Sequence, residues 1–248
     1  MDKTQKRLCL VTGSTHGIGF AIAEKLGNIP GNKIIISSRK EENSKPSEER
    51  LKSANIDFEY FTCDFNSKSQ RLSLKKYIQE AYGKLDVLVL TVQSMPYLGL
   101  AIDISEKEFT KMYNTNIKNT FFTILDFLPL LKIGNKSAIV ILGSYSAYYP
   151  FPYEGVFSLT KSVLLSLVKI LAQEFSKFNI RVNCVNPGTV KKRINSSILT
   201  NELIEKNFLK RDSLPHETAG FCAFLTTDEA SYINGENVSV NGGMIGRL

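Results

Sequence analysis

The chain has 248 residues, of which 43% are hydrophobic and 22% are charged, the balance of a globular protein with a sizeable core. This composition excludes a disulfide-stapled peptide scaffold and a disordered chain. Lysine and arginine number 31 against 24 aspartate and glutamate, and the net charge of +7 suits an anionic ligand. Nucleic acid would also fit this charge, but the basic residues are scattered, so we expect no nucleic-acid partner.

The sequence carries no signal for export, membrane insertion or metal binding. No stretch reaches the roughly 18 uninterrupted apolar residues of a membrane span, because Asp126, Lys161 and Lys169 interrupt the most apolar regions. The N-terminus leads into a strand-like run without the apolar core of a targeting sequence. The 4 cysteines lack metal-ligand spacing, so we expect reduced thiols, no metal site and a cytoplasmic protein.

Short apolar or β-branched runs alternate with helical stretches along the chain. The runs lie at 8–12, 33–37, 58–62, 86–90, 138–142, 180–185 and 237–240. Ile34-Ile35-Ile36 and Val87-Leu88-Val89-Leu90 are apolar without alternation, which indicates strands covered on both faces. We predict an α/β fold with one domain over residues 1–248, a single Rossmann-type doubly wound parallel sheet of about seven strands with helices on both faces.

Helical patterns fall between these runs. Apolar residues at three- and four-residue spacing predict a long helix over 156–175. Pro215 followed by Glu217 predicts the start of another helix. The polar stretch 41–50, with Pro46 inside it, is interpreted as a loop or a short exposed helix.

A glycine-rich turn follows the first predicted strand and precedes an apolar helix. It reads Gly13-Ser14-Thr15-His16-Gly17-Ile18-Gly19. Glycines let the backbone turn tightly and approach a pyrophosphate, whose charge then lies on the free N–H groups at the helix start. A plain left-handed turn would explain the glycines but not their place between strand and helix, so this segment predicts nucleotide binding.

The second predicted strand ends in Ser37-Ser38-Arg39-Lys40, where a dinucleotide fold normally has an acidic side chain. Arg39 and Lys40 would attract a 2′-phosphate and offer no acceptor to a bare ribose. The sequence therefore favours NADP(H) over NAD(H) as cofactor. Two exposed basic residues at a strand end are the alternative interpretation.

With this loop, the chain resembles the short-chain dehydrogenase/reductases along essentially its whole length. Functional residues of that family stand at the matching places of this sequence, namely Asp64, Asn116, Ser144, Lys161, Pro187 and Gly188. Segments 37–40, 180–188 and 228–236 look most like the peroxisomal NADPH-dependent carbonyl/retinal reductase group of the family. The resemblance implies that Asp64, Lys161, Pro187, Gly188 and Val190 join the glycine turn in binding the cofactor.

The catalytic positions of that family are complete here except for one. In the family a tyrosine gives a proton to the carbonyl oxygen as hydride arrives from nicotinamide, and a lysine four residues later supports it. A serine orients the carbonyl and an asparagine supports a proton relay. By resemblance these supporting roles fall to Lys161, Ser144 and Asn116, but Phe157 stands in place of the tyrosine. We therefore expect hydride transfer to be lost or weak.

Two further positions depart from the family. Its NNAG turn, which braces the sheet beside the cofactor, reads Leu90-Thr91-Val92-Gln93 here, so that turn must be built differently. Lys192 stands where the family usually has a threonine that bonds the nicotinamide amide. Both changes bear on the placement of nicotinamide.

Four tyrosines lie just before the long helix, at Tyr145, Tyr148, Tyr149 and Tyr153. We interpret them as the lining of an apolar pocket or its lid. An active NADPH-dependent carbonyl/retinal reductase in which one of them, or water, is the displaced proton donor is the alternative function. A third hypothesis is a binding module that holds an acidic partner through the basic surface.

Each of these polar residues also has a structural interpretation. Ser144 could cap a strand end, Asn116 could satisfy a helix backbone, and Lys161 could pair with a carboxylate. His16 and His216 have no partner at metal-ligand or nucleophile spacing.

Partners and location follow from the resemblance alone. The helix 156–175 and the region 103–131 resemble the helices by which these reductases dimerise, which implies a homodimer or homotetramer, or a subunit of a larger assembly. A small carbonyl or alcohol is the expected ligand. Gly246-Arg247-Leu248 matches a peroxisomal address only in its last two residues, so the peroxisome is the alternative to the cytoplasm.

Overall fold

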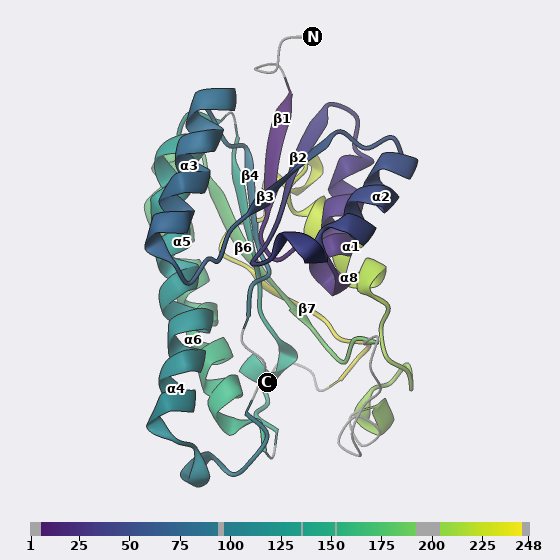
Figure 1. Cartoon of the computed structure of the whole chain (residues 1–248). Coiled ribbons are helices and arrows are strands. Elements are labelled where there is room, and N and C mark those ends of the chain that lie inside the picture. Colours follow the sequence, from purple (N-terminus) through teal and green to yellow (C-terminus); the bar gives the residue numbers. More distant parts are fainter. Residues whose placement is uncertain (1–5, 94–96, 135, 152, 192–203, 245–248) are drawn as a thin grey trace.

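A parallel sheet forms the middle layer of the structure, a computed structural model that describes residues 6–93, 97–134, 136–151, 153–191 and 204–244 (Figure 1). Its strands are β1 (Arg7–Val11), β2 (Asn32–Ser38), β3 (Phe58–Thr62), β4 (Val87–Leu90), β5 (Ala138–Leu142), β6 (Arg181–Pro187) and β7 (Asn237–Val240). Neighbouring strands are all parallel, in the order β3-β2-β1-β4-β5-β6-β7. The predicted Rossmann-type sheet is confirmed, with strand bounds that move by at most two residues.

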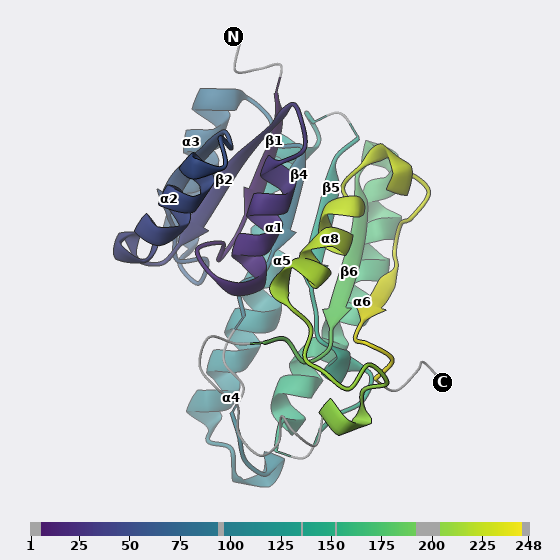
Figure 2. The ribbon, with the colours of Figure 1, turned by 90° about the vertical axis from the view of Figure 1, so that its right-hand side faces the viewer.

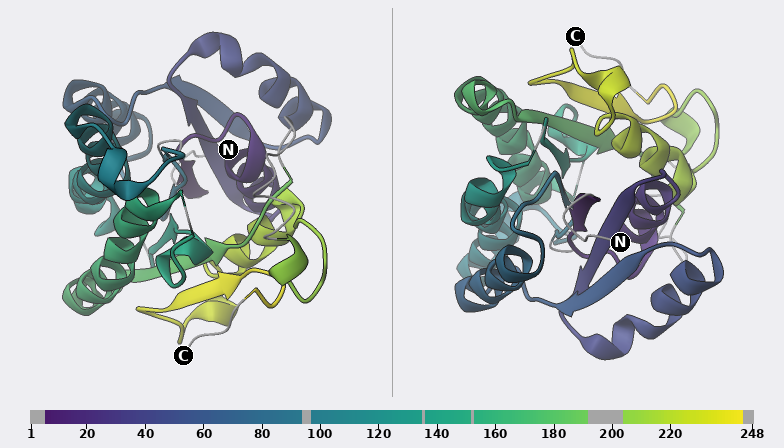
Figure 3. Two further views of the ribbon diagram at one scale, coloured as in Figure 1. Left: turned by 90° about the horizontal axis from the view of Figure 1, so that it is seen from below. Right: turned by 90° about the horizontal axis from the view of Figure 1, so that it is seen from above.

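Helices cover both faces of this sheet (Figures 1 and 3). They are α1 (Gly17–Gly27), α2 (Lys45–Ser53), α3 (Lys68–Tyr82), α4 (Glu106–Tyr113), α5 (Asn119–Leu131), α6 (Gly155–Phe175) and α8 (Pro215–Phe224). Shorter segments are η2 (Glu41–Asn43), η3 (Ala101–Asp103), η4 (Asn114–Lys118), η5 (Tyr145–Ala147), η6 (Ser176–Phe178) and η7 (Asp228–Ala230). One face carries α3, α5 and α6, and the other carries α1, α2 and α8.

Each strand contributes side chains to two hydrophobic cores. In β1, Leu8 and Leu10 pack with the α3, α5 and α6 side, whereas Cys9 and Val11 pack with the α1 and α8 side. Both sets are almost fully buried because helices cover both faces. This arrangement explains why the strands are apolar without alternation in the sequence.

The carboxyl ends of all strands meet at one edge, because the strands are parallel. In Figure 1 this is the lower edge, opposite the N-terminus, and α4 extends beyond it. Figure 2 shows the chain that leads into α8 at the same end. Loops at this edge are where a doubly wound sheet holds its ligand.

The polar stretch after β2 is mostly helical. It forms η2 and then α2, in which Pro46 lies in the first turn, where its missing N–H costs nothing. Only Ser47 and Leu51 of α2 are buried. The prediction of a short exposed helix therefore describes this element, and the loop is limited to its start.

The long helix α6 is apolar on more than one face. Within the described residues, the stretch Gly155–Phe178 is the one helix long and apolar enough to cross a membrane, and half of that window is buried inside the protein. Its buried side chains pack against the sheet, among them Leu164, Val168 and Leu171. A core helix of this kind meets the same criterion without being in a membrane.

Candidate functional site

The turn after β1 has the backbone that the glycines predict. Gly13 and Gly17 adopt left-handed backbone angles, with φ of 58° and 57°. A Cβ on Gly19 would lie 2.4 Å from the carbonyl oxygen of Gly13, a contact that only glycine avoids. Helix α1 begins at Gly17 without a side-chain cap from its N-cap residue, so its first N–H groups remain available for an anion.

Ser14 ties this turn to the end of β2. Its hydroxyl donates to the carbonyl of Val11 (2.6 Å) and accepts from the N–H of Ser37 (2.9 Å). Its own N–H donates to the carbonyl of Ser37 (2.9 Å). Since its backbone and side-chain donors are both used within the protein, Ser14 positions the turn.

The other predicted residues of the turn surround the start of α1. His16 is the N-cap residue and is exposed, with its Nδ1 3.4 Å from the Thr15 hydroxyl. Ile18 packs against the core between α1 and the sheet. Within the turn, His16 and Gly17 are exposed, whereas Gly19 is buried.

In the altered turn after β4, Thr91 forms the hydrogen bonds that link β4 to the glycine turn. Its N–H donates to Thr12 Oγ1 (3.0 Å), and its hydroxyl donates to the carbonyl of Thr12. The same hydroxyl lies 3.5 Å from the carbonyl of Gly13. A threonine thus links the end of β4 to the glycine turn. In this protein it replaces the contact that the turn after β4 would otherwise make through asparagine.

The basic residues after β2 are exposed at the same edge of the sheet. Arg39 has its side chain in solvent, and Lys40 forms an exposed ion pair with Glu42 (3.2 Å), a contact of little energetic weight. Asp64, after β3, accepts from the N–H and the side-chain amide of Asn66 (both 3.0 Å). All three predicted residues lie at neighbouring strand ends, β2 and β3.

Lys161 lies on α6 one turn after Phe157, on the buried side of the helix. Its ammonium donates to the carbonyl of Leu142 at the end of β5 (3.2 Å) and lies 5.5 Å from the centre of the Phe157 ring. Only 2% of the residue is exposed. Burial lowers the pKa of Lys161 to about 8. The pairing with a carboxylate is not found among the described residues.

Ser144 follows β5 and starts the short segment η5. Its N–H donates to Asn186 Oδ1 on β6 (3.1 Å), which fixes its backbone against the neighbouring strand. Its hydroxyl accepts from the N–H of Ser146 (3.2 Å) and lies 2.7 Å from the Ser146 hydroxyl. Ser144 therefore caps η5, whereas its structural interpretation had it cap the end of a strand, and its side chain is half-buried.

Asn116 lies in η4, a π-helical segment between α4 and α5, and is buried. Its side-chain amide donates to Thr160 Oγ1 (2.9 Å), and that hydroxyl donates to the carbonyl of Phe157 (2.7 Å). The contact joins Asn116 to the same turn of α6 that carries Phe157 and Lys161. π-Helical segments inside helices are frequent at functional sites.

Phe157 is packed in an apolar cluster. Its buried neighbours are Met112 and Val156, and Tyr97 and Ile104 pack against the same cluster. The ring is 7% exposed. Of the described tyrosines, Tyr97 is the one found in this cluster.

The four tyrosines before α6 lie elsewhere. Tyr145 packs with Phe151, with ring centres 4.8 Å apart, and burial raises the pKa of its phenol. The hydroxyl of Tyr148 donates to the backbone carbonyl at the start of β7 (3.0 Å). Tyr149 is exposed, and Tyr153 is half-exposed with a left-handed φ of 67°, before α6 begins.

Pro187 ends β6, and Gly188 follows it against the end of β7. The N–H of Gly188 donates to the carbonyl of Val240 (3.1 Å). A Cβ on Gly188 would lie 2.9 Å from the Cα of Asn241. Glycine is therefore needed at position 188 so that the segment after β6 can lie close to the segment after β7.

The residues that follow Gly188 turn back on a later segment. Val190 forms a parallel bridge with Ser213. The hydroxyl of Thr189 is buried and has no hydrogen-bond partner among the described residues. Lys192 and the C-terminal Gly246-Arg247-Leu248 lie outside the described residues.

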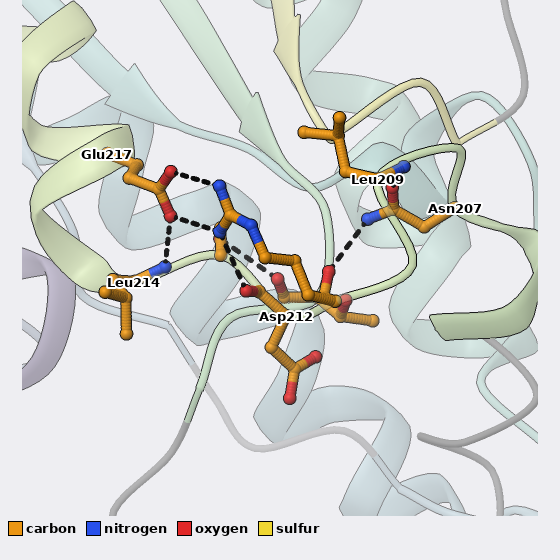
Figure 4. Close-up of polar contacts among 8 residues, drawn as sticks. Asn207, Leu209, Asp212, Leu214 and Glu217 are labelled. Carbon is orange, nitrogen blue, oxygen red and sulfur yellow. Dashed lines mark hydrogen bonds and ion pairs between the residues drawn. The ribbon is translucent and has the colours of Figure 1, made fainter.

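The segment before α8 is held to the helix by charge (Figure 4). Glu217 accepts from the N–H of Leu214 (2.7 Å) and from both guanidinium nitrogens of Arg211 (2.7 Å each). The Arg211 guanidinium, together with the Leu214 N–H, lowers the pKa of Glu217 to about 2. Asn207 closes the other end, accepting from the N–H of Leu209 (2.8 Å) and donating to the carbonyl of Arg211 (3.1 Å). The predicted helix start, Pro215 followed by Glu217, is confirmed, since α8 begins at Pro215 with Glu217 in its first turn.

Metal ligation finds no support in the described part of the chain. No group of three or more His, Cys, Asp or Glu side chains within it could hold a metal ion. The four cysteines are buried free thiols.

Three residues at the site were missed from the sequence. They are Thr91, Ser146 and Tyr97. The sequence showed that the turn at Thr91 lacks the family's asparagine, but it did not show what Thr91 contacts. For Ser146 the one signal was a second hydroxyl two positions after Ser144. Tyr97 carried no local signal, because its contact with the Phe157 cluster joins segments about sixty residues apart.

Comparison with known proteins gives consistent matches over nearly the whole chain. A family model described as Enoyl-(Acyl carrier protein) reductase matches residues 13–245. The chain is 36% identical to Tropinone reductase-like 3 of Erythroxylum coca, with 100% of both chains covered. It is 34% identical to Dehydrogenase/reductase SDR family member 4 of Bos taurus, covering 98% of this chain and 88% of that protein. A short-chain dehydrogenase/reductase structure from Serratia marcescens has the same fold, with a TM-score of 0.90 at 24% identity over 98% of this chain and 99% of the other.

Proposed function

Because the chain belongs to the short-chain dehydrogenase/reductase family, we propose that it is an NADP(H)-binding, carbonyl-reductase-like protein whose hydride transfer is lost or weak. The observation that carries this proposal is Phe157, a buried phenyl ring beside the ammonium of Lys161. The proposal treats residues 1–248 as one nucleotide-binding domain. The chemistry we propose is that of the carbonyl/retinal reductase group that the sequence resembles.

The residues at the strand ends fit a dinucleotide. The uncapped start of α1 would hold the pyrophosphate, and Gly19 permits the close backbone approach. Arg39 and Lys40 would hold a 2′-phosphate, since exposed cations there have only a weak partner of their own. A bound NADPH would supply the hydride.

Among the described residues, the ring beside the Lys161 ammonium carries no hydroxyl. Lys161 donates to the Leu142 carbonyl, and its ammonium lies 5.5 Å from the centre of the Phe157 ring, where a tyrosine would supply the proton. Ser144 could orient a carbonyl oxygen, but a serine hydroxyl is too weak an acid to replace a phenol. Loss of a positioned general acid typically lowers the rate by about 10² to 10⁴, which is why we expect weak or absent turnover.

A single substitution tests this function. Phe157→Tyr should raise the rate of NADPH-dependent ketone reduction by about 10² to 10⁴, because it restores the phenol one turn before Lys161. Phe224→Tyr on α8 is the matched control and should change nothing. Fluorescence titration should show tighter binding of NADPH than of NADH. Wild-type turnover of about 1 per second or faster would overturn the proposal, and absence of NADPH binding would do so independently.

A second candidate is an active reductase with a displaced phenol, and Tyr97, which contacts the Phe157 cluster, is a fifth tyrosine to test beside the four expected. Tyr97 packs against the Phe157 cluster, and its hydroxyl folds back over Gly99, 2.5 Å from where a Cβ of that glycine would lie. If wild-type turnover is high, Tyr97→Phe should abolish it, whereas Tyr145→Phe, Tyr148→Phe, Tyr149→Phe and Tyr153→Phe should not. Unchanged turnover in all five variants would leave water as the donor.

The finer assignments of partner and place are also proposals. We propose a homodimer or homotetramer built on α5 and α6, with a small carbonyl or alcohol as ligand and no nucleic-acid partner. The proposed location is the cytoplasm, with the peroxisome as alternative. A fluorescent fusion that leaves the C-terminus free distinguishes the two locations.

A further inference from the structure

Ser144 and Ser146, at the start of η5, have side-chain hydroxyl groups within hydrogen-bonding distance of each other. Ser144 Oγ and Ser146 Oγ lie 2.7 Å apart, and the N–H of Ser146 also donates to Ser144 Oγ (3.2 Å). Ser146 is 0% exposed, whereas Ser144 is half-buried. Ser146 is therefore enclosed by the protein, whereas Ser144 borders the candidate site.

Counting hydrogens fixes the direction of the bond between them. Within the described part of the chain, Ser144 Oγ is the one hydrogen-bond partner of Ser146 Oγ. If Ser144 donated to Ser146, the hydrogen of Ser146 would be buried without an acceptor, which is unfavourable. The favourable arrangement has Ser146 donating to Ser144.

This arrangement uses up the acceptor capacity of Ser144. A hydroxyl oxygen has two lone pairs, and here they receive the N–H and the O–H of Ser146. The hydrogen of Ser144 is then the part left to point into the site. Accepting two hydrogen bonds also polarises that O–H and strengthens its own donation.

We propose that Ser146 is a positioning residue that fixes Ser144 as a hydrogen-bond donor to a ligand oxygen. The inference rests on the proposed function, since it takes Ser144 as part of a ligand site. It makes the site selective for a ligand that offers an acceptor, such as a ketone oxygen, over one that must donate to Ser144. Ser146 acts through Ser144 and does not itself touch the ligand.

The test measures binding of benzil, an aromatic diketone, to protein saturated with NADPH. Ser146→Ala should weaken benzil binding by about two- to tenfold, because the Ser144 hydroxyl is then no longer held as a donor to the ligand. In a Ser144→Ala background the same change should have no effect, because its route to the ligand is gone. The carbonyl stretching frequency of bound benzil should rise in Ser146→Ala and return in Ser146→Thr.

Ser158→Ala is the matched control. Ser158 is also 0% exposed, and its hydroxyl has no partner among the described residues, so its loss should leave benzil binding unchanged. Ser146→Cys, which keeps the volume but donates weakly, serves if the alanine variant fails to fold. Equal losses from Ser146→Ala in both backgrounds, or no benzil binding despite normal NADPH binding, would overturn the inference. Failure to bind NADPH would instead count against the proposed function.

Discussion

Lys161 is a charged residue enclosed by the protein without a counter-charge among the described residues. Burial lowers its pKa from 10.5 to about 8. Between these pH values the unfolded chain keeps a proton that the folded protein has lost, so stability rises with pH across this interval. At about 1.4 kcal/mol per pKa unit, the buried ammonium costs the folded protein about 3 kcal/mol at neutral pH.

Lys161→Met should remove this cost. The free energy of unfolding of wild type minus that of the variant should increase by about 3 kcal/mol between pH 8 and pH 10.5. Ionisation of the tyrosines and of the cysteines other than Cys184 occurs in both proteins and cancels in the difference. Burial raises the pKa of Cys184, the thiol on which the Lys161 charge acts, to about 12, so it stays protonated in the folded protein over this interval. Urea titrations at several pH values measure it, and a difference that stays constant with pH would show that Lys161 is not buried as a cation.

Single residues divide into those that a spacing predicts and those that only the fold brings together. Phe157 and Lys161 were placed correctly on one helix because residues four apart share a helix face. Ser146 was missed because its role depends on complete burial, which a sequence does not display. Tyr97 was missed because its neighbours come from α4 and α6.

At the scale of elements, the glycine turn should tolerate no side chain at Gly19. A Cβ there would meet the carbonyl of Gly13 at 2.4 Å and the hydroxyl of Thr91 at 2.8 Å. Gly19→Ala should therefore weaken NADPH binding at least about tenfold and lower the free energy of unfolding by about 1 to 3 kcal/mol. Fluorescence titration and urea unfolding measure the two effects.

Gly31→Ala separates loss of stability from loss of binding. Gly31 has a left-handed φ of 86° but nothing within 4 Å of its Cβ position, in the turn that leads into β2. Alanine there should cost about 1 to 2 kcal/mol of stability and leave NADPH affinity unchanged. Normal NADPH affinity in Gly19→Ala would mean that the turn is not the phosphate site.

Elements were predictable where their signal is local. The glycine turn and the start of α8 at Pro215 follow from residues adjacent in sequence. The brace from Thr91 to Thr12 and the ion pair from Arg211 to Glu217 do not, because each depends on how a loop folds back. Most contacts that could not be predicted from the sequence therefore lie in the loops at the carboxyl edge of the sheet.

At the scale of the whole molecule, continuous apolar strands required helices on both faces, and this predicted the layers correctly. The same reasoning applies to α6, which buries one face and still exposes apolar side chains on another. Leu159, Val163 and Ile170 are 54%, 40% and 51% exposed and follow one another at helical spacing. Figure 1 shows α5 and α6 on the same side of the sheet, and Phe122 of α5 is 43% exposed.

A second copy of the chain is the partner we expect on this face. An apolar stripe on each of two identical helices would be covered by a symmetric contact. Wild type should sediment as a particle of at least twice 27.8 kDa, and the double variant Leu159→Asp with Val163→Asp should sediment as a monomer, because two desolvated carboxylates would face each other. Leu72→Asp on α3, where Leu72 is 39% exposed, is the control and should leave the assembly intact. A monomeric wild type at micromolar concentration would contradict the dimer and leave the stripe of α6 without this explanation.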